Sequence, residues 1–233
     1  MRRLDDPEVV RQEYASERFL AARKAAYRNA EGPDAREVAF QAVAEVAPRR
    51  ILEVGCGEGE LSERMQRELG AEVVAVDQSE RMVELTRTRG VDARVGDVQA
   101  LPLGDEEFDC AVAAWMLYHV PDLDRALAEL ARVLRPGGRL VAVTNAPEHL
   151  LELRELIGLG SWRFSFNADE AEADLARHFG SVQRREAYGW VTFPDFDAAQ
   201  GHVEVMVSIE GRLPEFEGPL RARRLPVIFV ADK

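Results

Sequence analysis

Short apolar runs and amphipathic stretches alternate along the middle of the chain. Residues 123–134 repeat apolar side chains three and four positions apart, which is the spacing of a helix with one buried face. The apolar runs are short and rich in β-branched residues, as buried strands are. Together these patterns predict parallel strands connected by helices. The strands are expected at residues 50–52, 72–77, 94–98, 108–114 and 139–144.

The segments on either side of this core predict further elements. Strand-like runs at residues 181–193 and 225–231 would supply the sixth and seventh strands. Pro226 is acceptable there because proline is tolerated at the start of a strand. Five more helices are expected, at residues 8–30, 34–46 (with Asp34 as its N-cap), 147–157, 169–179 and 196–209.

Three glycines at alternate positions, Gly55, Gly57 and Gly59, directly follow the first strand. Glycine lets the backbone take positive φ and lets a ligand lie against the bare chain, while the next helix presents free N–H groups. The third glycine of a dinucleotide fingerprint would fall at Glu60, and no Gly-Lys-Ser/Thr of a P-loop follows. The pattern favours a cradle for a different cofactor, with a tight turn that binds no ligand as the alternative.

Carboxylates close the next two predicted strands. Asp77 ends the second strand, and Asp97 ends the third. An acid at such a strand end can accept hydrogen bonds from the two hydroxyls of a ribose. The alternatives are a helix N-cap for Asp77, a role that Ser79 could fill equally well, and a turn residue for Asp97 after Gly96.

The glycine motif Glu53-Val-Gly-Cys-Gly-Glu-Gly59 and the two acids resemble the cofactor motifs of the class I S-adenosylmethionine-dependent methyltransferases. Later motifs extend the resemblance to the branch that contains ubiquinone-biosynthesis and other small-molecule methyltransferases. They are Phe108-Asp109, His119-Val-Pro-Asp122 and Leu134-Arg-Pro-Gly-Gly138. The resemblance covers roughly residues 48–145 and implies an α/β fold, with a Rossmann-like, mostly parallel sheet of seven strands flanked by helices.

The resemblance also implies a domain organisation and a cofactor. Residues 1–47 would form an N-terminal helical lid, and residues 48–233 a Rossmann-like domain with an insertion around 146–180. The cofactor would be S-adenosyl-L-methionine, with its ribose on Asp77 and its adenine on Asp97. The residues expected to hold it are Tyr14, Glu53, Gly55, Cys56, Gly57, Asp77, Gln78, Met82, Asp97, Val98 and Ala114.

Two side chains after the fourth strand, Tyr118 and His119, are the candidates for catalysis. His119 has the ordinary pKa range of a general base. In the methyltransferases that the chain resembles, a histidine at this position is widespread among enzymes with different substrates. We therefore favour a structural hydrogen bond over a catalytic role for His119. In this class of enzyme, alignment of the acceptor atom with the methyl group supplies much of the rate acceleration. We therefore expect no catalytic metal ion. The absence of an Asn-Pro-Pro-Tyr motif disfavours methylation of adenine or glutamine amino groups.

Composition and charge narrow the possible partners. The chain has 233 residues and a formal net charge of −12, which disfavours a nucleic-acid substrate. It lacks an apolar run of membrane-spanning length and a signal-peptide pattern, and its two cysteines form no disulfide framework. We therefore expect a cytoplasmic monomer or homodimer that acts on a small molecule. An RNA- or protein-directed methyltransferase and a non-catalytic S-adenosylmethionine-binding module are the alternatives.

Aromatic residues after the fifth strand could line an apolar acceptor pocket, or they could simply pack in the core. They are Trp162, Phe164, Phe166, Trp190 and Phe193.

Overall fold

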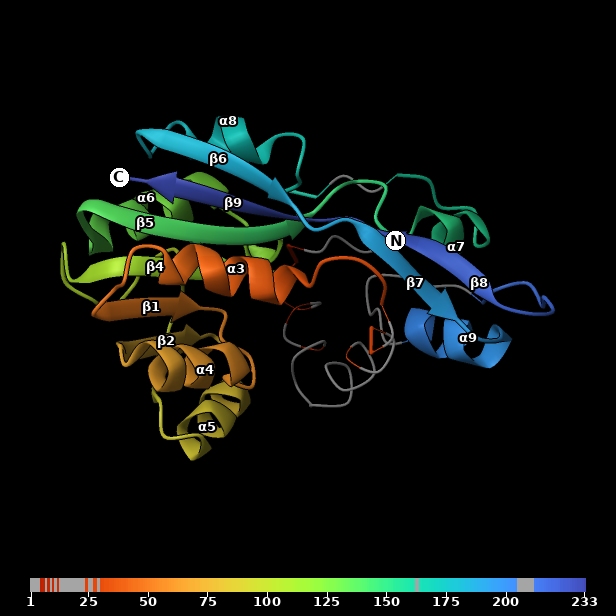
Figure 1. The fold of residues 1–233 in the computed structure, drawn as a ribbon, viewed down its shortest axis with the longest axis horizontal. Helices are drawn as coiled ribbons and strands as arrows, with labels where there is room; N and C mark the ends of the chain where they lie inside the picture. The colour runs from red at the N-terminus through yellow and green to blue at the C-terminus, as the bar shows by residue number, and fades with distance from the viewer. Residues whose placement is uncertain are drawn as a thin grey trace.

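One sheet of seven strands organises the molecule (Figure 1). Its strands, in order across the sheet, are β3 (Asp92–Val95), β2 (Glu72–Asp77), β1 (Arg50–Val54), β4 (Phe108–Ala114), β5 (Leu134–Asn145), β9 (Pro226–Asp232) and β6 (Ser181–Glu186). Only β9 runs antiparallel to its neighbours, so the expected α/β, Rossmann-like and mostly parallel sheet is confirmed. The computed structural model describes residues 5, 6, 8, 10, 12, 24, 27, 28, 30–161, 164–204 and 212–233.

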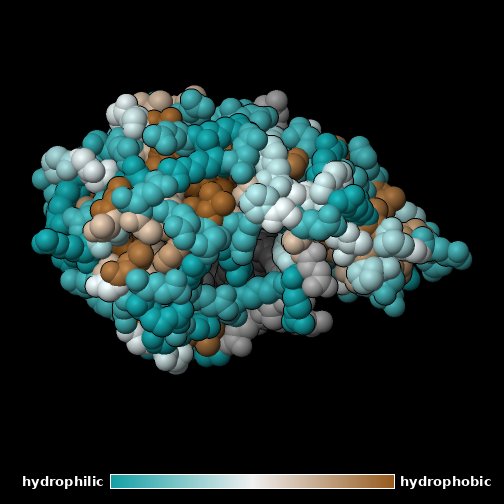
Figure 2. Space-filling view, viewed as in Figure 1, coloured by the Kyte–Doolittle hydropathy of each residue, from teal (hydrophilic) through white to brown (hydrophobic). Residues whose placement is uncertain are grey.

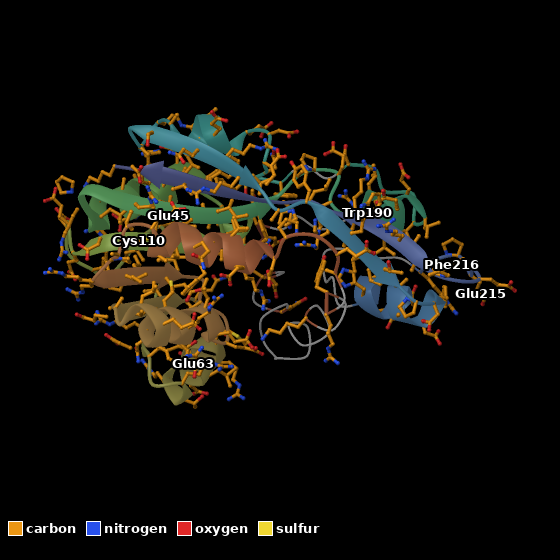
Figure 3. The ribbon with its side chains drawn as sticks, viewed as in Figure 1. Glu45, Glu63, Cys110, Trp190, Glu215 and Phe216 are labelled. Atoms are coloured by element: carbon orange, nitrogen blue, oxygen red, sulfur yellow. The ribbon has the colours of Figure 1, made fainter. Side chains whose placement is uncertain are left out.

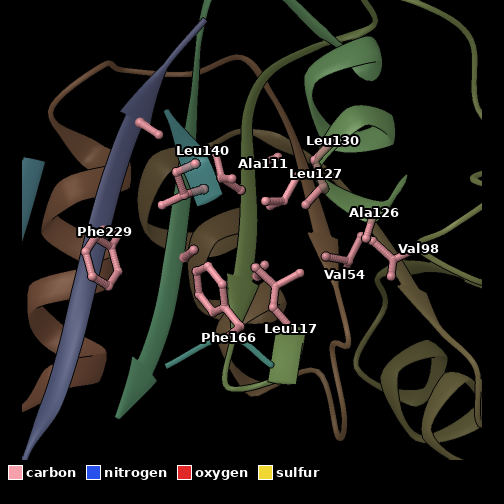
Figure 4. Packing of buried hydrophobic residues seen from close by; sticks show 14 of the residues in the cluster. Val54, Val98, Ala111, Leu117, Ala126, Leu127, Leu130, Leu140, Phe166 and Phe229 are labelled. Atoms are coloured by element: carbon pink, nitrogen blue, oxygen red, sulfur yellow. The ribbon is translucent and has the colours of Figure 1, made fainter. Parts of the chain in front are cut away.

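Helices cover both faces of the sheet. One face packs against α3 (Ala35–Ala44), α4 (Glu60–Leu69) and α5 (Glu80–Thr88). The other packs against α6 (Leu123–Val133) and α8 (Ala171–Leu175), and Figure 4 shows part of this second layer. Because the central strands are buried on both faces, their sequences are nearly continuous apolar runs rather than alternating patterns.

Some predicted helix caps and strand starts agree with the structure, and others shift by one or more residues. Asp34 caps α3 by accepting the N–H of Arg36 at 2.9 Å, as expected. The fifth strand begins at Leu134 rather than at residue 139. Leu134 pairs with Phe108, and the register then shifts before Arg139 pairs with Cys110. The stretch Pro136-Gly137-Gly138 therefore lies within an irregular strand and not before it.

A small second sheet stands apart from the first. It consists of β7 (Gly189–Phe193) and β8 (Leu220–Arg224), which pair antiparallel. Together with α7 (Leu151–Glu155) and α9 (Phe196–Glu204) it forms a unit with its own apolar cluster, which we call the outer lobe. The lobe extends beyond the carboxyl end of β5 (Figure 1).

The prediction of a single strand over residues 181–193 is wrong, because β6 ends at Glu186 and β7 belongs to the outer lobe. Gly189 explains the break. A Cβ there would lie 1.8 Å from the Glu31 carbonyl oxygen, so only glycine permits this crossing. The next residue, Trp190, exchanges both backbone hydrogen bonds with Glu31, at 2.8 and 3.1 Å. The chain thus leaves the main sheet to pair with the segment that precedes α3.

Other predicted bounds also change. The third strand ends at Val95, so Asp97 follows it two residues later instead of closing it. The helices expected at residues 147–157 and 169–179 shrink to the short α7 and α8. Most of the helix expected at residues 8–30 lies outside the described residues.

The surface is mainly hydrophilic on the face shown in Figure 2, where hydrophobic residues form only small separate groups. Among the described residues, no helix is long and apolar enough to cross a membrane.

Candidate functional site

The loop between β1 and α4, residues 55–59, lies at the carboxyl edge of the sheet. Gly55, Gly57 and Gly59 have φ values of 66°, 54° and 74°, which confirms the glycine-dependent turn. Two of them are required by packing. A Cβ at Gly55 would lie 2.6 Å from the Met116 Cβ, and one at Gly59 would lie 2.7 Å from the Thr86 methyl carbon.

Gly57 differs from the other two because it faces open space. Among the described residues, no atom lies within 4 Å of the position that its Cβ would take. Its N–H donates to Asp77 Oδ2 at 3.0 Å, which joins the loop to the end of β2. Bare backbone, open space and a neighbouring carboxylate together fit a cradle in which a ligand could lie against the chain.

Asp77 ends β2 beside this loop, as predicted. Its carboxylate accepts the N–H groups of Gly57 and of Ser79, the latter at 2.9 Å. The N-cap of α5 is Ser79, so the alternative role of Asp77 as the cap is wrong. Each carboxylate oxygen retains further acceptor capacity, as hydrogen bonds to ribose hydroxyls would require. Burial raises the pKa of Asp77, and donors from a bound ligand would favour its charged form.

Asp97 is exposed and lies in the turn after β3. Its carboxylate accepts the backbone N–H of Gln99 at 2.8 Å and the side-chain amide of Gln99 at 3.0 Å. Gln99 in turn accepts the N–H of Asp122, the residue that caps α6. Asp97 is therefore held in position at the edge of the sheet, and it is at once a turn residue and a carboxylate open to a ligand.

Glu53 is the buried acid of the glycine motif. It is 3% exposed and accepts a hydrogen bond from the Ser62 hydroxyl. Burial raises its pKa to about 8, and the negative charge of Asp77 adds to the shift. Burial also raises the pKa of Cys56, whose Sγ lies 3.5 Å from the Thr86 hydroxyl, so this thiol is not an activated nucleophile. A cationic ligand group near Glu53 would favour its ionised form.

The segment after β4 closes one side of the cradle. Trp115 adopts a positive φ of 54°, an uncommon conformation for a residue with a side chain. Its N–H donates to the Val143 carbonyl at 2.9 Å, and its indole donates to Asn145 Oδ1 at 3.4 Å. These contacts join the end of β4 to the end of β5, while Met116 packs against Gly55 on the other side.

Tyr118 and His119, the two catalytic candidates, lie in the short helix η1 (Leu117–His119) that follows. His119 is 9% exposed, and its ring centroid lies 4.5 Å from that of Tyr118. Burial against a neighbouring ring agrees with the structural role that we favour. Both assignments remain predictions.

The other predicted cofactor residues differ in exposure. Gln78 is exposed and Ala114 is half-buried, whereas Val98 is buried. Met82 is completely buried and has no exposed surface to offer a ligand. Tyr14 lies outside the described residues.

The described aromatic residues do not form one wall, and two of them pack in apolar cores, as the alternative predicted. Phe166 packs in the core of the main sheet, and Phe193 packs in the outer lobe. Trp190 lies on β7 and is 36% exposed (Figure 3). The guanidinium carbon of Arg221 lies 4.5 Å from the centroid of its ring. Trp162 lies outside the described residues.

Two residues of the N-terminal segment reach the site, and sequence patterns did not reveal them. Lys24 Nζ forms ion pairs with Glu58, in the glycine loop, and with Glu60 at 2.7 Å. Tyr27 Oη lies 3.0 Å from His149 Nε2, at the start of the outer lobe. The partners are far apart in sequence. Neither residue lies in a motif that sequence patterns could have linked to these partners.

Comparison with known proteins agrees with this geometry. A methyltransferase domain model matches residues 52–142. An uncharacterized methyltransferase of Mycobacterium tuberculosis is 41% identical over 118 residues, which cover 48% of this chain and 48% of the relative. Demethylmenaquinone methyltransferase of Thermus thermophilus is 39% identical over 119 residues, which cover 48% of this chain and 54% of the relative. The matched region thus spans about half the length of these curated relatives.

A solved structure from Thermotoga maritima, described as a possible histamine N-methyltransferase, shares the fold with a TM-score of 0.60. It is 24% identical, and the match covers 96% of this chain and 99% of that one. The sheet order, the glycine loop, the acids that follow the next two strands and the domain match all lead to one conclusion. Residues 52–142 form a methyltransferase domain, and the chain has the Rossmann-like fold of S-adenosylmethionine-dependent methyltransferases.

Proposed function

We propose that this protein transfers the methyl group of S-adenosylmethionine to a small-molecule acceptor. The observation that carries the proposal is the open space beside Gly57, where the backbone turns with positive φ next to Asp77. Asp77 would hold the ribose, Asp97 the adenine, and buried Glu53 would favour a cationic group at the methionine end. When bound, the cofactor supplies an electrophilic methyl group, and the chain's own residues orient the acceptor and exclude water.

A small-molecule acceptor is supported by charge and by the relatives. Arginines that lie close together in the sequence, at residues 184–185 and 221–224, include members paired with acids, as Arg185 is with Glu45 at 2.7 Å and Arg221 with Glu31 at 2.8 Å. With a net charge of −12, the chain offers little attraction to a phosphate backbone. The Thermus thermophilus relative is named for a small quinone acceptor, demethylmenaquinone. We expect a cytoplasmic enzyme, as a monomer or homodimer.

The test is a screen for release of S-adenosylhomocysteine from S-adenosylmethionine across hydroxyl- and amine-bearing metabolites, with tRNA and peptides as separate arms. We expect turnover with a small molecule and none with tRNA. Turnover only with RNA or peptide would contradict the acceptor class. Cofactor binding without turnover in any arm would favour a non-catalytic binding module.

A further inference from the structure

The last turn of α5 holds the glycine loop from one side. The hydroxyl of Thr86 donates to the carbonyl oxygen of Gly57 at 2.9 Å. Nε of Arg89, the C-cap residue of α5, donates to the carbonyl oxygen of Glu58 at 2.6 Å. Two successive carbonyl groups of the loop therefore point toward α5, and both donors lie outside the glycine motif.

These hydrogen bonds fix the direction of the peptide groups in the loop. In a planar trans peptide, the C=O and N–H bonds point in opposite directions. The N–H of Glu58 therefore faces away from α5, because the carbonyl of the same peptide group faces Thr86. Within the described part of the chain, no backbone carbonyl accepts this N–H, whereas the N–H of Gly59 closes the loop by donating to the Cys56 carbonyl at 2.9 Å.

Thr86 is completely buried, and the glycine loop surrounds its side chain. Its hydroxyl also lies 3.5 Å from the Sγ of Cys56. A Cβ at Gly59 would lie 2.7 Å from both the methyl carbon and the hydroxyl oxygen of Thr86, so this side chain packs directly against Gly59. One side chain of α5 thus contacts Cys56, Gly57 and Gly59.

Arg89 is fixed by the helix that follows the loop. Its Nη1 forms an ion pair with Glu63, in the first turn of α4, at 2.7 Å. Its Nη2 lies 3.8 Å from Glu60 in the same turn. The guanidinium therefore joins α5, the glycine loop and the start of α4.

We propose that Thr86 and Arg89 are positioning residues for the cofactor, because they hold the glycine loop in the conformation that the cofactor binds. The proposal rests on the proposed function, since it needs a cofactor that lies against Gly57. Glycines give a loop more conformational freedom than other residues do. A loop that is fixed in advance loses less of this freedom when the ligand binds, so affinity depends on the residues that fix it.

Two substitutions separate the hydroxyl of Thr86 from its methyl group. Thr86→Val removes the hydroxyl and keeps the shape, whereas Thr86→Ser keeps the hydroxyl and removes the methyl group. We expect Thr86→Val to weaken S-adenosylhomocysteine binding about 10-fold, because the carbonyl of Gly57 loses its donor. Thr86→Ser should stay within about twofold of wild type. Calorimetry measures these affinities, and a role in packing alone would leave both at the wild-type value.

The matched control is Thr144→Val on β5. Thr144 is also completely buried, and its hydroxyl donates to a backbone carbonyl, that of Phe166 at 2.6 Å. Phe166 belongs to the apolar cluster on the face of the sheet opposite to α5. Both valine variants should lower the melting temperature, by about 2–4 °C for each 1 kcal/mol lost. Only Thr86→Val should lose cofactor affinity.

Arg89→Met tests the second contact, and Arg87→Met is its control. Arg87 lies on the same helix, and its Nε also donates to a backbone carbonyl, that of Ala93 in β3 at 2.9 Å. We expect the affinity for S-adenosylhomocysteine to fall about threefold in Arg89→Met and to stay unchanged in Arg87→Met. These variants test the proposal even if Thr86→Val does not fold.

Hydrogen exchange tests the loop without a ligand. The N–H of Gly59 bonds the Cys56 carbonyl within the loop, so its exchange rate reports how often the loop opens. In the free protein we expect this amide to exchange about 10-fold faster in Thr86→Val than in Thr144→Val.

Equal exchange rates in the two valine variants would overturn the inference. Wild-type affinity for S-adenosylhomocysteine in folded Thr86→Val and Arg89→Met proteins would also overturn it. A wild-type protein that does not bind S-adenosylhomocysteine contradicts the proposed function instead. The exchange rates need no ligand, so they show in either case whether Thr86 fixes the loop.

Discussion

At the scale of single residues, the cofactor site depends on glycines that look alike in sequence but have different neighbours. Gly55 and Gly59 are enclosed by Met116 and Thr86, whereas Gly57 faces open space. Gly90, just after α5, also has positive φ, and no atom of the part of the chain that the structure describes lies within 4 Å of the position that its Cβ would take. Gly90 therefore shares the backbone conformation of Gly57 but not its place at the cradle.

This pair gives a matched test. Gly57→Ala and Gly90→Ala should each cost about 1 kcal/mol of unfolding free energy, because alanine is disfavoured at positive φ. Only Gly57→Ala should weaken S-adenosylhomocysteine binding, by about 10-fold or more, because its methyl group would occupy the cradle. Calorimetry and chemical denaturation measure the two quantities. Equal cofactor affinity in both variants would show that the ligand does not lie against Gly57.

Glu53 carries a second prediction at this scale. Its pKa rises from 4.5 in the unfolded chain to about 8 in the folded protein, mainly through burial. Between these values the folded state holds a proton that the unfolded state has lost, so stability falls as pH rises, by at most about 1.4 kcal/mol per pH unit. Glu53→Gln removes this dependence.

Urea denaturation at pH 5 and pH 8 checks the effect of Glu53. The Glu53→Gln variant should gain stability relative to wild type on going from pH 5 to pH 8, whereas a Glu84→Gln variant at an exposed position should not. A wild-type protein whose stability relative to Glu53→Gln is the same at both pH values would contradict the raised pKa.

At the scale of elements, the segment after β4 brings the cradle and the acceptor side together. The short helix η1 buries His119 against Tyr118, and its backbone N–H bonds the Met116 carbonyl at 2.9 Å. Met116 itself encloses Gly55. A disturbance in η1 should therefore reach the glycine loop through packing.

We expect His119→Ala to lose roughly 1–3 kcal/mol of unfolding free energy, because a buried polar side chain and its packing are removed. Activity should fall only in proportion to the folded fraction. Denaturation curves and kcat at saturating S-adenosylmethionine distinguish this from a general base, whose loss lowers kcat by about 10²–10⁴. A stable His119→Ala protein that binds cofactor but does not methylate would make His119 the base.

An element could be predicted when its sequence pattern lay within a few neighbouring residues. The glycine loop and Asp77 were predictable, because a buried strand, a tight turn and a strand-end acid each leave a mark within a few residues. The break between β6 and β7 was not, because it results from Gly189 meeting Glu31, a distant residue. The Tyr27–His149 bond joins residues 122 positions apart, and neither residue lies in a recognisable motif. The described aromatic residues do not line one pocket, because β7 turns Trp190 away from the core.

At the scale of the whole molecule, one sheet edge gathers the groups of the proposed site. The ends of β2, β1, β4 and β5 place Asp77, the glycine loop, Trp115 and Asn145 in one row, and the outer lobe adds His149 beyond them. This is the edge at which open α/β sheets bind ligands. The order of the strands thus converts residues scattered between positions 24 and 225 into one site.

A calorimetric titration of the protein with S-adenosylhomocysteine, repeated with NAD and with the Asp77→Ala variant, tests this cofactor site without any need for an acceptor. We predict one binding site for S-adenosylhomocysteine and no heat of binding with NAD. We also predict that Asp77→Ala weakens the binding by roughly 1.5–3 kcal/mol for each charge-assisted hydrogen bond lost. Binding of NAD without binding of S-adenosylhomocysteine, or full affinity in a folded Asp77→Ala protein, would contradict the assignment of the site.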